Sequence, residues 1–212
     1  MPLDALLIEA VIVLPAVAIL GVYHWRLWRR SRSTPMATAM GRHRLVRVAW
    51  VEMLQDGNRD LLAVHTIRNW IMSATLLAST SILFSLGVLG AAFTNDKLSH
   101  IAHQLNFVGS EDTRLWLFKG LVMLVIFLAA FFNFSLAIRS FIHAGFAINL
   151  TPDQKATFGK NLGGEELERG AMHYTLGLRA YYLAFPFTLW LFGPLWMLAG
   201  SILLVVLLRR VD

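Results

Sequence analysis

Long apolar runs separated by short charged segments dominate the pattern of hydrophobic and polar positions along this chain. The clearest run, residues 70–93, carries no charged side chain over 24 positions. At a rise of about 1.5 Å per residue, a helix of that length crosses a hydrocarbon core about 30 Å thick. Three further runs are comparably long and apolar. The pattern therefore predicts an all-α integral membrane bundle with four transmembrane helices, at residues 5–25, 70–93, 115–138 and 180–208.

Small side chains recur at helical spacing along one face of the run at residues 70–93. A face of this kind lets a neighbouring helix approach closely, as helix packing in lipid requires. We expect this helix to be the most deeply packed of the four, against the phenylalanine-rich run at residues 115–138. The small residues are Ala74, Ala78, Ser81, Ser85 and Ala92.

The last apolar run, residues 180–208, is longer than a helix perpendicular to the membrane needs. Pro186 and Pro194 fall inside it, and we expect them to kink a single helix. The alternative is a half-helix that re-enters the membrane around Gly193 and Pro194.

The segment between the first two runs carries nine arginines, from Arg26 to Arg68. Its middle, residues 42–56, predicts an amphipathic helix that lies flat on the anionic inner leaflet or docks a partner. A second amphipathic cytoplasmic helix is expected to begin at Glu165. The apolar face of the first comprises Val46, Ala49, Trp50, Met53 and Leu54.

The distribution of positive charge predicts the orientation in the membrane. Asp4 precedes the first run and arginines follow it, the reverse of a cleaved signal peptide, so we expect an uncleaved span with its N-terminus outside. Fourteen of the nineteen Lys and Arg residues lie in segments 26–68 and 139–179, which this topology places inside. Arg209 and Arg210 would then lie outside, against the rule.

Composition excludes several classes of protein. The 212 residues are 57% hydrophobic and only 15% charged, which fits one membrane domain spanning residues 1–212. The absence of cysteine excludes disulfides, thiol nucleophiles and thiolate metal sites. The net charge of +6 follows from basic residues beside apolar spans, so we expect the lipid bilayer as a partner and no nucleic acid.

Two longer motifs resemble those of the family called "domain of unknown function 599". Residues 66–80 read TIRNWIMSATLLAST, and residues 177–186 read GLRAYYLAFP, followed by WLFGP at 190–194. The resemblance implies a small polytopic membrane protein of bacteria or plants, and we expect a bacterial plasma membrane location. It implies no assigned activity. Shorter similarities occur at Tyr23, His24 and residues 47–51.

The predicted topology places a set of polar residues at one depth, the inner membrane boundary. Three interpretations remain open: a structural polar network, a site for an anion or lipid headgroup, and a haem or metal site held by histidines from different helices. The sequence favours no cofactor. The set comprises His24, His65, Arg68, Asn69, Arg139, His143, His173 and Arg179.

The loop at residues 94–114 adds one weak candidate for metal binding. His100 and His103 are spaced so that one helix could direct both at a single ion, or they could simply lie on a solvated face.

No nucleophile elbow, phosphate-binding glycine loop or HExxH motif occurs in the sequence. We therefore expect a non-enzymatic membrane protein that acts as a homo-oligomer or as an accessory subunit of a membrane complex. The alternatives are an oligomeric channel or transporter for an anion or lipid headgroup, and a His-ligated haem or metal protein.

Overall fold

The computed structural model describes residues 3–55, 60–94, 104, 106–109, 112–159 and 161–212. Within these residues the regular elements are all helices and no strand occurs, so the predicted all-α class is confirmed. In chain order they are α1 (Leu3–Ser33), the 3-10 helix η1 (Pro35–Ala37), α2 (Ala39–Gln55), α3 (Asp60–Thr94), α5 (Thr113–Ile148), α6 (Pro152–Phe158), α7 (Leu162–Trp190) and α8 (Pro194–Val211).

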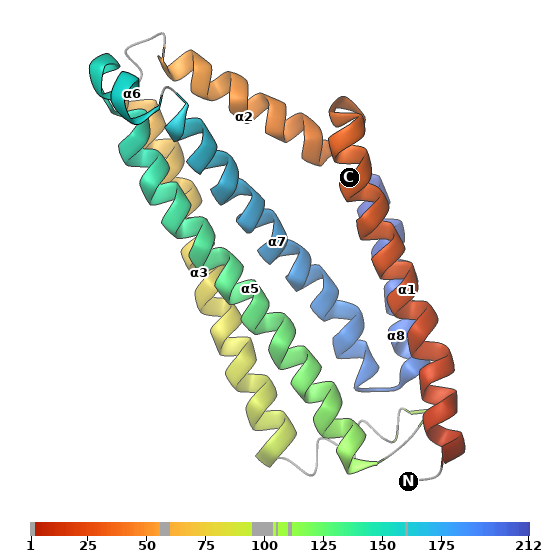
Figure 1. The fold of residues 1–212 in the computed structure, drawn as a ribbon. Coiled ribbons are helices and arrows are strands. Elements are labelled where there is room, and N and C mark those ends of the chain that lie inside the picture. Colours follow the sequence, from red (N-terminus) through yellow and green to blue (C-terminus); the bar gives the residue numbers. More distant parts are fainter. Residues whose placement is uncertain (1–2, 56–59, 95–103, 105, 110–111, 160) are drawn as a thin grey trace.

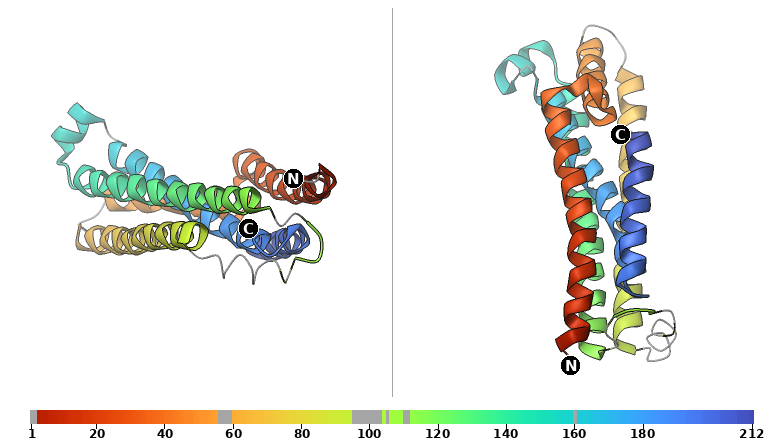
Figure 2. Two further views of the ribbon diagram at one scale, coloured as in Figure 1. Left: turned by 90° about the horizontal axis from the view of Figure 1, so that it is seen from below. Right: turned by 90° about the vertical axis from the view of Figure 1, so that its right-hand side faces the viewer.

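The long helices α1, α3, α5, α7 and α8 form an elongated bundle in which consecutive helices run in opposite directions (Figure 1, Figure 2). Helix α2 crosses the end of the bundle that lies away from the N-terminus, from α1 toward α3. We call this the arginine-rich end. Among the described residues, four helices are long and apolar enough to cross a membrane: Leu6–Ser33, Leu61–Ala92, Thr113–Ile148 and Pro194–Val211.

The predicted single helix over residues 180–208 is wrong, because the chain reverses direction inside that run. Helix α7 ends at Trp190 and α8 begins at Pro194. Gly193 between them has φ of 134°, a backbone conformation that L side chains rarely adopt, and Pro194 lacks the N–H needed to continue a helix. The break therefore lies where the alternative interpretation placed it, whereas Pro186 lies inside α7.

The reversal changes the position of the last two arginines. Because α8 returns along α1 and α7, Arg209 and Arg210 lie toward the arginine-rich end (Figure 1). The main-chain N–H of Ala39, at the start of α2, donates to the main-chain oxygen of Asp212 over 2.8 Å. The expectation that both chain ends lie on one side of the bundle is therefore wrong, and the apparent exception in the charge distribution disappears.

The small-residue face on α3 packs as predicted. Ala74, Ala78, Ser81 and Ser85 are buried, whereas the fifth residue of the face, Ala92, is only partly buried. Ala78 packs in a cluster with Phe134 of α5. However, α3 is not the most deeply packed span, because a larger share of the spans on α5 and α8 is buried. Helix α3 contacts mainly α5 and leaves its opposite face uncovered.

Two phenylalanines of α5 lie directly against two glycines of α7. A Cβ atom at Gly177 would come within 2.7 Å of the ring of Phe134, and one at Gly170 within 2.6 Å of the ring of Phe141. The two glycines are seven residues apart in the sequence, and so are the two phenylalanines. Only glycine leaves room for the ring at these positions, so the pairs determine how closely α5 and α7 approach.

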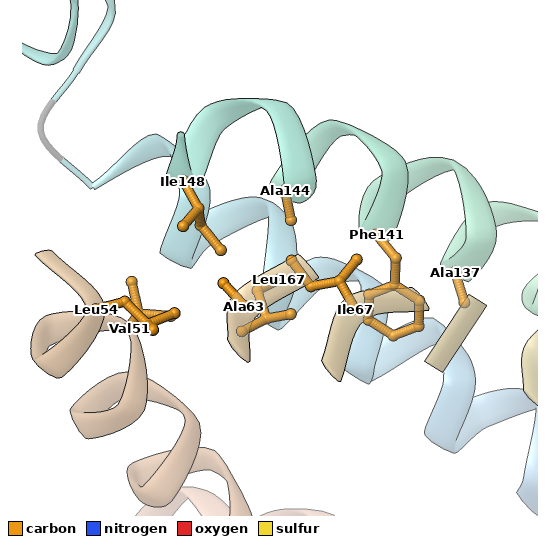
Figure 3. Close-up of a cluster of buried hydrophobic side chains, with 9 residues drawn as sticks. All are labelled: Val51, Leu54, Ala63, Ile67, Ala137, Phe141, Ala144, Ile148 and Leu167. Carbon is orange, nitrogen blue, oxygen red and sulfur yellow. The ribbon is translucent and has the colours of Figure 1, made fainter. Parts of the chain in front are cut away.

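Helix α2 is anchored to the bundle by a cluster of buried apolar residues from α2, α3, α5 and α7 (Figure 3). Trp50, Met53 and Leu54 contribute as predicted, but Ala49 is exposed and Val46 is 65% exposed. Arg47 pairs with Glu168 of α7 at 3.0 Å, so the helix turns a different face inward. The buried residues of this cluster, labelled in Figure 3, are Val51, Leu54, Ala63, Ile67, Ala137, Phe141, Ala144, Ile148 and Leu167.

Candidate functional site

The predicted polar set does not form one network, because the structure divides it among three places. His65, Arg68 and Asn69 are exposed on α3. His24 and Arg179 lie near the last turn of α8. The remaining three, Arg139, His143 and His173, line one pocket between α5 and α7.

This α5–α7 pocket has a volume of about 610 Å³ and lies at the arginine-rich end. It combines basic and apolar groups with one acidic side chain, Glu166. Arg139 and His143 are one helical turn apart on α5, and Arg169 and His173 are one turn apart on α7. The apolar wall is formed by Leu136, Phe146, Ala147, Leu150, Phe158 and Leu162.

The polar groups of the pocket differ in how well they are satisfied. Arg169 forms an ion pair with Glu166 at 2.9 Å, and the ring nitrogen Nδ1 of His173 lies 3.1 Å from the side-chain oxygen of Asn133. The side chains of Arg139 and His143 have no hydrogen-bond or ion-pair partner in the part of the chain that the structure describes. Arg139 therefore offers an unneutralised guanidinium beside an apolar wall, which suits an anionic group carried on an apolar body.

A second polar group joins α1, α7 and α8. The carboxylate of Asp212 accepts hydrogen bonds from Arg179 Nη2, at 3.1 and 3.2 Å, and from the hydroxyl of Tyr23. His24 Nδ1 lies 2.8 Å from the carbonyl oxygen of Leu20, so that nitrogen carries the proton. Within the described chain, His24 Nε2 and Arg179 Nη1 are buried without partners.

A third group, at the opposite end, contains residues that the sequence reasoning did not connect. Lys119 of α5 forms an ion pair with Glu9 of α1 at 2.7 Å, and Trp190 Nε1 donates to the same carboxylate oxygen over 2.8 Å. Glu9 and Lys119 were each visible in the sequence as the one charged residue in an apolar run. Lone charges of opposite sign near the same end of two spans are the signal that could have paired them.

A protein-family profile described as "Protein of unknown function, DUF599" matches residues 11–212. The chain belongs to the DUF599 family. The match covers nearly the whole chain, which confirms the resemblance inferred from its motifs. No curated protein matches the chain, and no solved structure matches it.

In this DUF599 protein the two longer motifs lie against each other. The motif at residues 66–80 belongs to α3 and the motif at 177–186 to α7. The hydroxyl of Tyr181 donates to the carbonyl of Leu77 over 2.7 Å and lies 2.9 Å from the hydroxyl of Ser81. The motifs therefore include residues that hold α3 against α7, which is a structural role.

The four histidines of the predicted polar set do not come together at one site in this DUF599 protein. His143 and His173 line the α5–α7 pocket, whereas His24 lies on α1 and His65 is exposed on α3. Among the described residues, no group of three or more His, Cys, Asp or Glu side chains could hold a metal ion. His100 and His103 lie outside the described residues.

Proposed function

We propose that this DUF599 protein is a non-enzymatic integral membrane protein that binds an anionic ligand in the α5–α7 pocket. The observation that carries the proposal is the unpaired guanidinium of Arg139 beside an apolar wall. The ligand would place a phosphate or carboxylate against Arg139, with Arg169 and the two histidines around it. An apolar part of the ligand would contact Phe146 and Phe158.

We also propose that the arginine-rich end faces the cytoplasm of a bacterial cell and that the N-terminus lies outside. The clustering of basic residues at this end supports that orientation, because cytoplasmic segments next to membrane spans carry excess Lys and Arg. The return of α8 adds Arg209 and Arg210 to the same end. Under this orientation the pocket opens at the inner membrane boundary.

Binding of two probes to the purified protein tests the proposed pocket. Hexyl phosphate supplies both the anion and an apolar chain, and inorganic phosphate supplies the anion alone. We expect hexyl phosphate to bind at least about tenfold more tightly, since each buried CH₂ contributes roughly 0.8 kcal/mol. Arg139→Gln should abolish most of the binding of either probe.

Arg68→Gln is the matched control, because Arg68 is exposed on α3 and lies outside the pocket. It removes the same charge from the same end of the bundle. Equal losses in the two variants would mean that the probes sense overall charge, and the assignment to this pocket would then be wrong.

A second proposal concerns assembly: we infer that copies of the protein associate through the uncovered face of α3. Thr75 and Ser79 lie on this face within an apolar span, and the hydroxyl of Ser79 has no partner in the described part of the chain. A Cβ at Gly87 on this helix would meet nothing within 4 Å. Small and polar side chains at an exposed face of a span favour contact with another helix.

Native mass spectrometry after mild extraction tests the assembly. We expect a dimer or larger homo-oligomer, and Ser79→Leu should reduce it while Leu83→Met, also on the exposed part of α3, should not. A strictly monomeric wild-type protein would contradict self-association, whereas a different bound subunit would support the role of an accessory subunit. Anion flux in liposomes that requires both Arg139 and Ser79 would identify an oligomeric transporter.

A further inference from the structure

A groove between α1 and α8 at the arginine-rich end is separate from the α5–α7 pocket. It has a volume of about 810 Å³ and is bounded at its top by Ala37 of η1 and by Thr38, which precedes α2. Its lower part is apolar, formed by Ile19 and Val22 of α1 and Val205 of α8. It thus extends from the arginine-rich end down along two helices that are apolar enough to lie in a membrane.

The upper part of the groove is strongly basic. Arg26 and Arg30 of α1 and Arg209 of α8 line it, and none of their side chains has a carboxylate partner in the described part of the chain. Asp212 also lines the groove, but its carboxylate is already bound by Arg179 and Tyr23. The three arginines at the rim therefore retain their charge.

The other arginines of α1 are held away from this rim. The guanidinium of Arg32 lies 3.8 Å from the ring centroid of Trp28, and that of Arg29 lies 5.6 Å from the ring centroid of Trp25. Neither arginine lines the groove. Of the four arginines on α1, only Arg26 and Arg30 therefore line the rim, and Arg29 and Arg32 provide a natural comparison.

The distance from the arginine rim to the apolar part of the groove matches the distance from the phosphate of a phospholipid to the first part of its acyl chain. Arg26 and Ile19 are seven residues apart, which is about 10 Å along a helix. A phosphate at the arginines would thus place the first part of an acyl chain beside Ile19, Val22 and Val205. A free phosphate would leave these apolar side chains without a contact.

We propose that this groove binds one anionic phospholipid from the leaflet at the arginine-rich end. The headgroup phosphate pairs with Arg26, Arg30 and Arg209, and one acyl chain packs along Ile19, Val22 and Val205. The bound lipid covers the seam between α1 and α8. This proposal does not depend on ligand binding in the α5–α7 pocket, which lies between other helices and has its own arginine.

Lipid selectivity in nanodiscs tests the proposal. The protein is reconstituted in phosphatidylcholine doped with phosphatidylglycerol, released into mild detergent, and analysed by native mass spectrometry for retained lipid. We expect the wild-type protein to retain one phosphatidylglycerol in preference to phosphatidylcholine. The double variant R26Q/R30Q should lower that preference roughly 25-fold, at about fivefold for each arginine near a membrane surface.

The variant R29Q/R32Q is the control. It also removes two positive charges from the last turns of α1, but from positions outside the groove. It should keep the preference. A second variant, Val22→Trp, fills the apolar part and keeps all the arginines, and it should also displace the lipid. The folding of each variant is checked by its helical circular dichroism and elution volume.

The proposal would be overturned by no preference in the wild-type protein, by equal losses in R26Q/R30Q and R29Q/R32Q, or by retention of lipid in Val22→Trp. Displacement of the lipid by millimolar inorganic phosphate would also overturn it, because it would identify a free anion as the ligand. Loss of probe binding in Arg139→Gln with intact lipid retention would separate the two sites. Intact probe binding in Arg139→Gln, together with intact lipid retention, would reject the α5–α7 pocket alone.

Discussion

The ammonium group of Lys119 and the carboxylate of Glu9 lie 2.7 Å apart, and each side chain is only 4% exposed. The pair joins α5 to α1 at the end of the bundle opposite α2. Trp190, at the end of α7, donates to the same carboxylate. Three helices therefore meet at one buried ion pair, next to the turn at which the chain reverses into α8.

Removing one partner of this pair should destabilise the protein, because the remaining charge would stay buried without the opposite charge that it pairs with. We expect Glu9→Gln and Lys119→Met each to lower the free energy of unfolding by about 3–5 kcal/mol. The double variant E9Q/K119M should recover most of that loss. Thermal unfolding in detergent measures the effect, with Val125→Ala, an exposed site on α5, as the control. Additive losses in the double variant would contradict the coupling.

Adding a methyl group at the phenylalanine contacts of α7 should also destabilise the bundle. Gly170→Ala and Gly177→Ala each force a Cβ into the ring of Phe141 or Phe134, and overpacking of this kind costs about 1–3 kcal/mol. The matched control is Gly21→Ala, because a Cβ there meets nothing within 4 Å. It should be neutral or slightly stabilising. Melting temperatures of the three variants should separate them, and equal values would argue against the close contact.

Neutralising Asp212 should weaken the attachment of α8. Arg179 is 13% exposed and Asp212 is 15% exposed, so Asp212→Asn leaves a largely buried guanidinium without its charged partner. We expect a loss of about 1–3 kcal/mol. Hydrogen–deuterium exchange would locate this loss of stability, because the amides of α8 should exchange faster than those of the other helices. Protection that falls equally in α3 and α8 would indicate general destabilisation instead.

The reversal at Gly193 predicts which residues share a side of the membrane. The native chain has no cysteine, so single cysteines can be introduced without background labelling. Met36→Cys and Val211→Cys should react with an impermeant maleimide from the same side, and Phe107→Cys from the opposite side. All three positions are exposed. A single continuous helix over residues 180–208 would instead place Val211→Cys and Phe107→Cys on one side.

The predictions that succeeded from sequence depend on local periodicity. The small face that includes Ala74 and Ser81 follows from helical spacing alone, and its burial does not require knowledge of the partner helix. The reversal before Pro194 failed for a physical reason: hydropathy sums apolar residues and is insensitive to a change of chain direction. Gly193 was the local signal, since only its positive φ permits the turn.

The parts of the candidate sites that were missed depend on contacts between distant segments. Arg47 rotates α2 toward Glu168, which lies 121 residues later in the chain, and this overrides the apolar face read from sequence. The division of the polar set has the same origin. A common depth along the membrane normal does not place His65 and Arg139 on facing sides of their helices.

The two phenylalanine–glycine contacts between α5 and α7 fix the position of one helix along the other. Sliding α7 by one turn, about 5.4 Å, would move Gly177 away from Phe134 and bring the part of α7 beside Tyr174 or Tyr181 opposite the ring. Both tyrosines already pack against that ring. The rings therefore block axial sliding in both directions. Helices α5 and α7 should therefore behave as one rigid body.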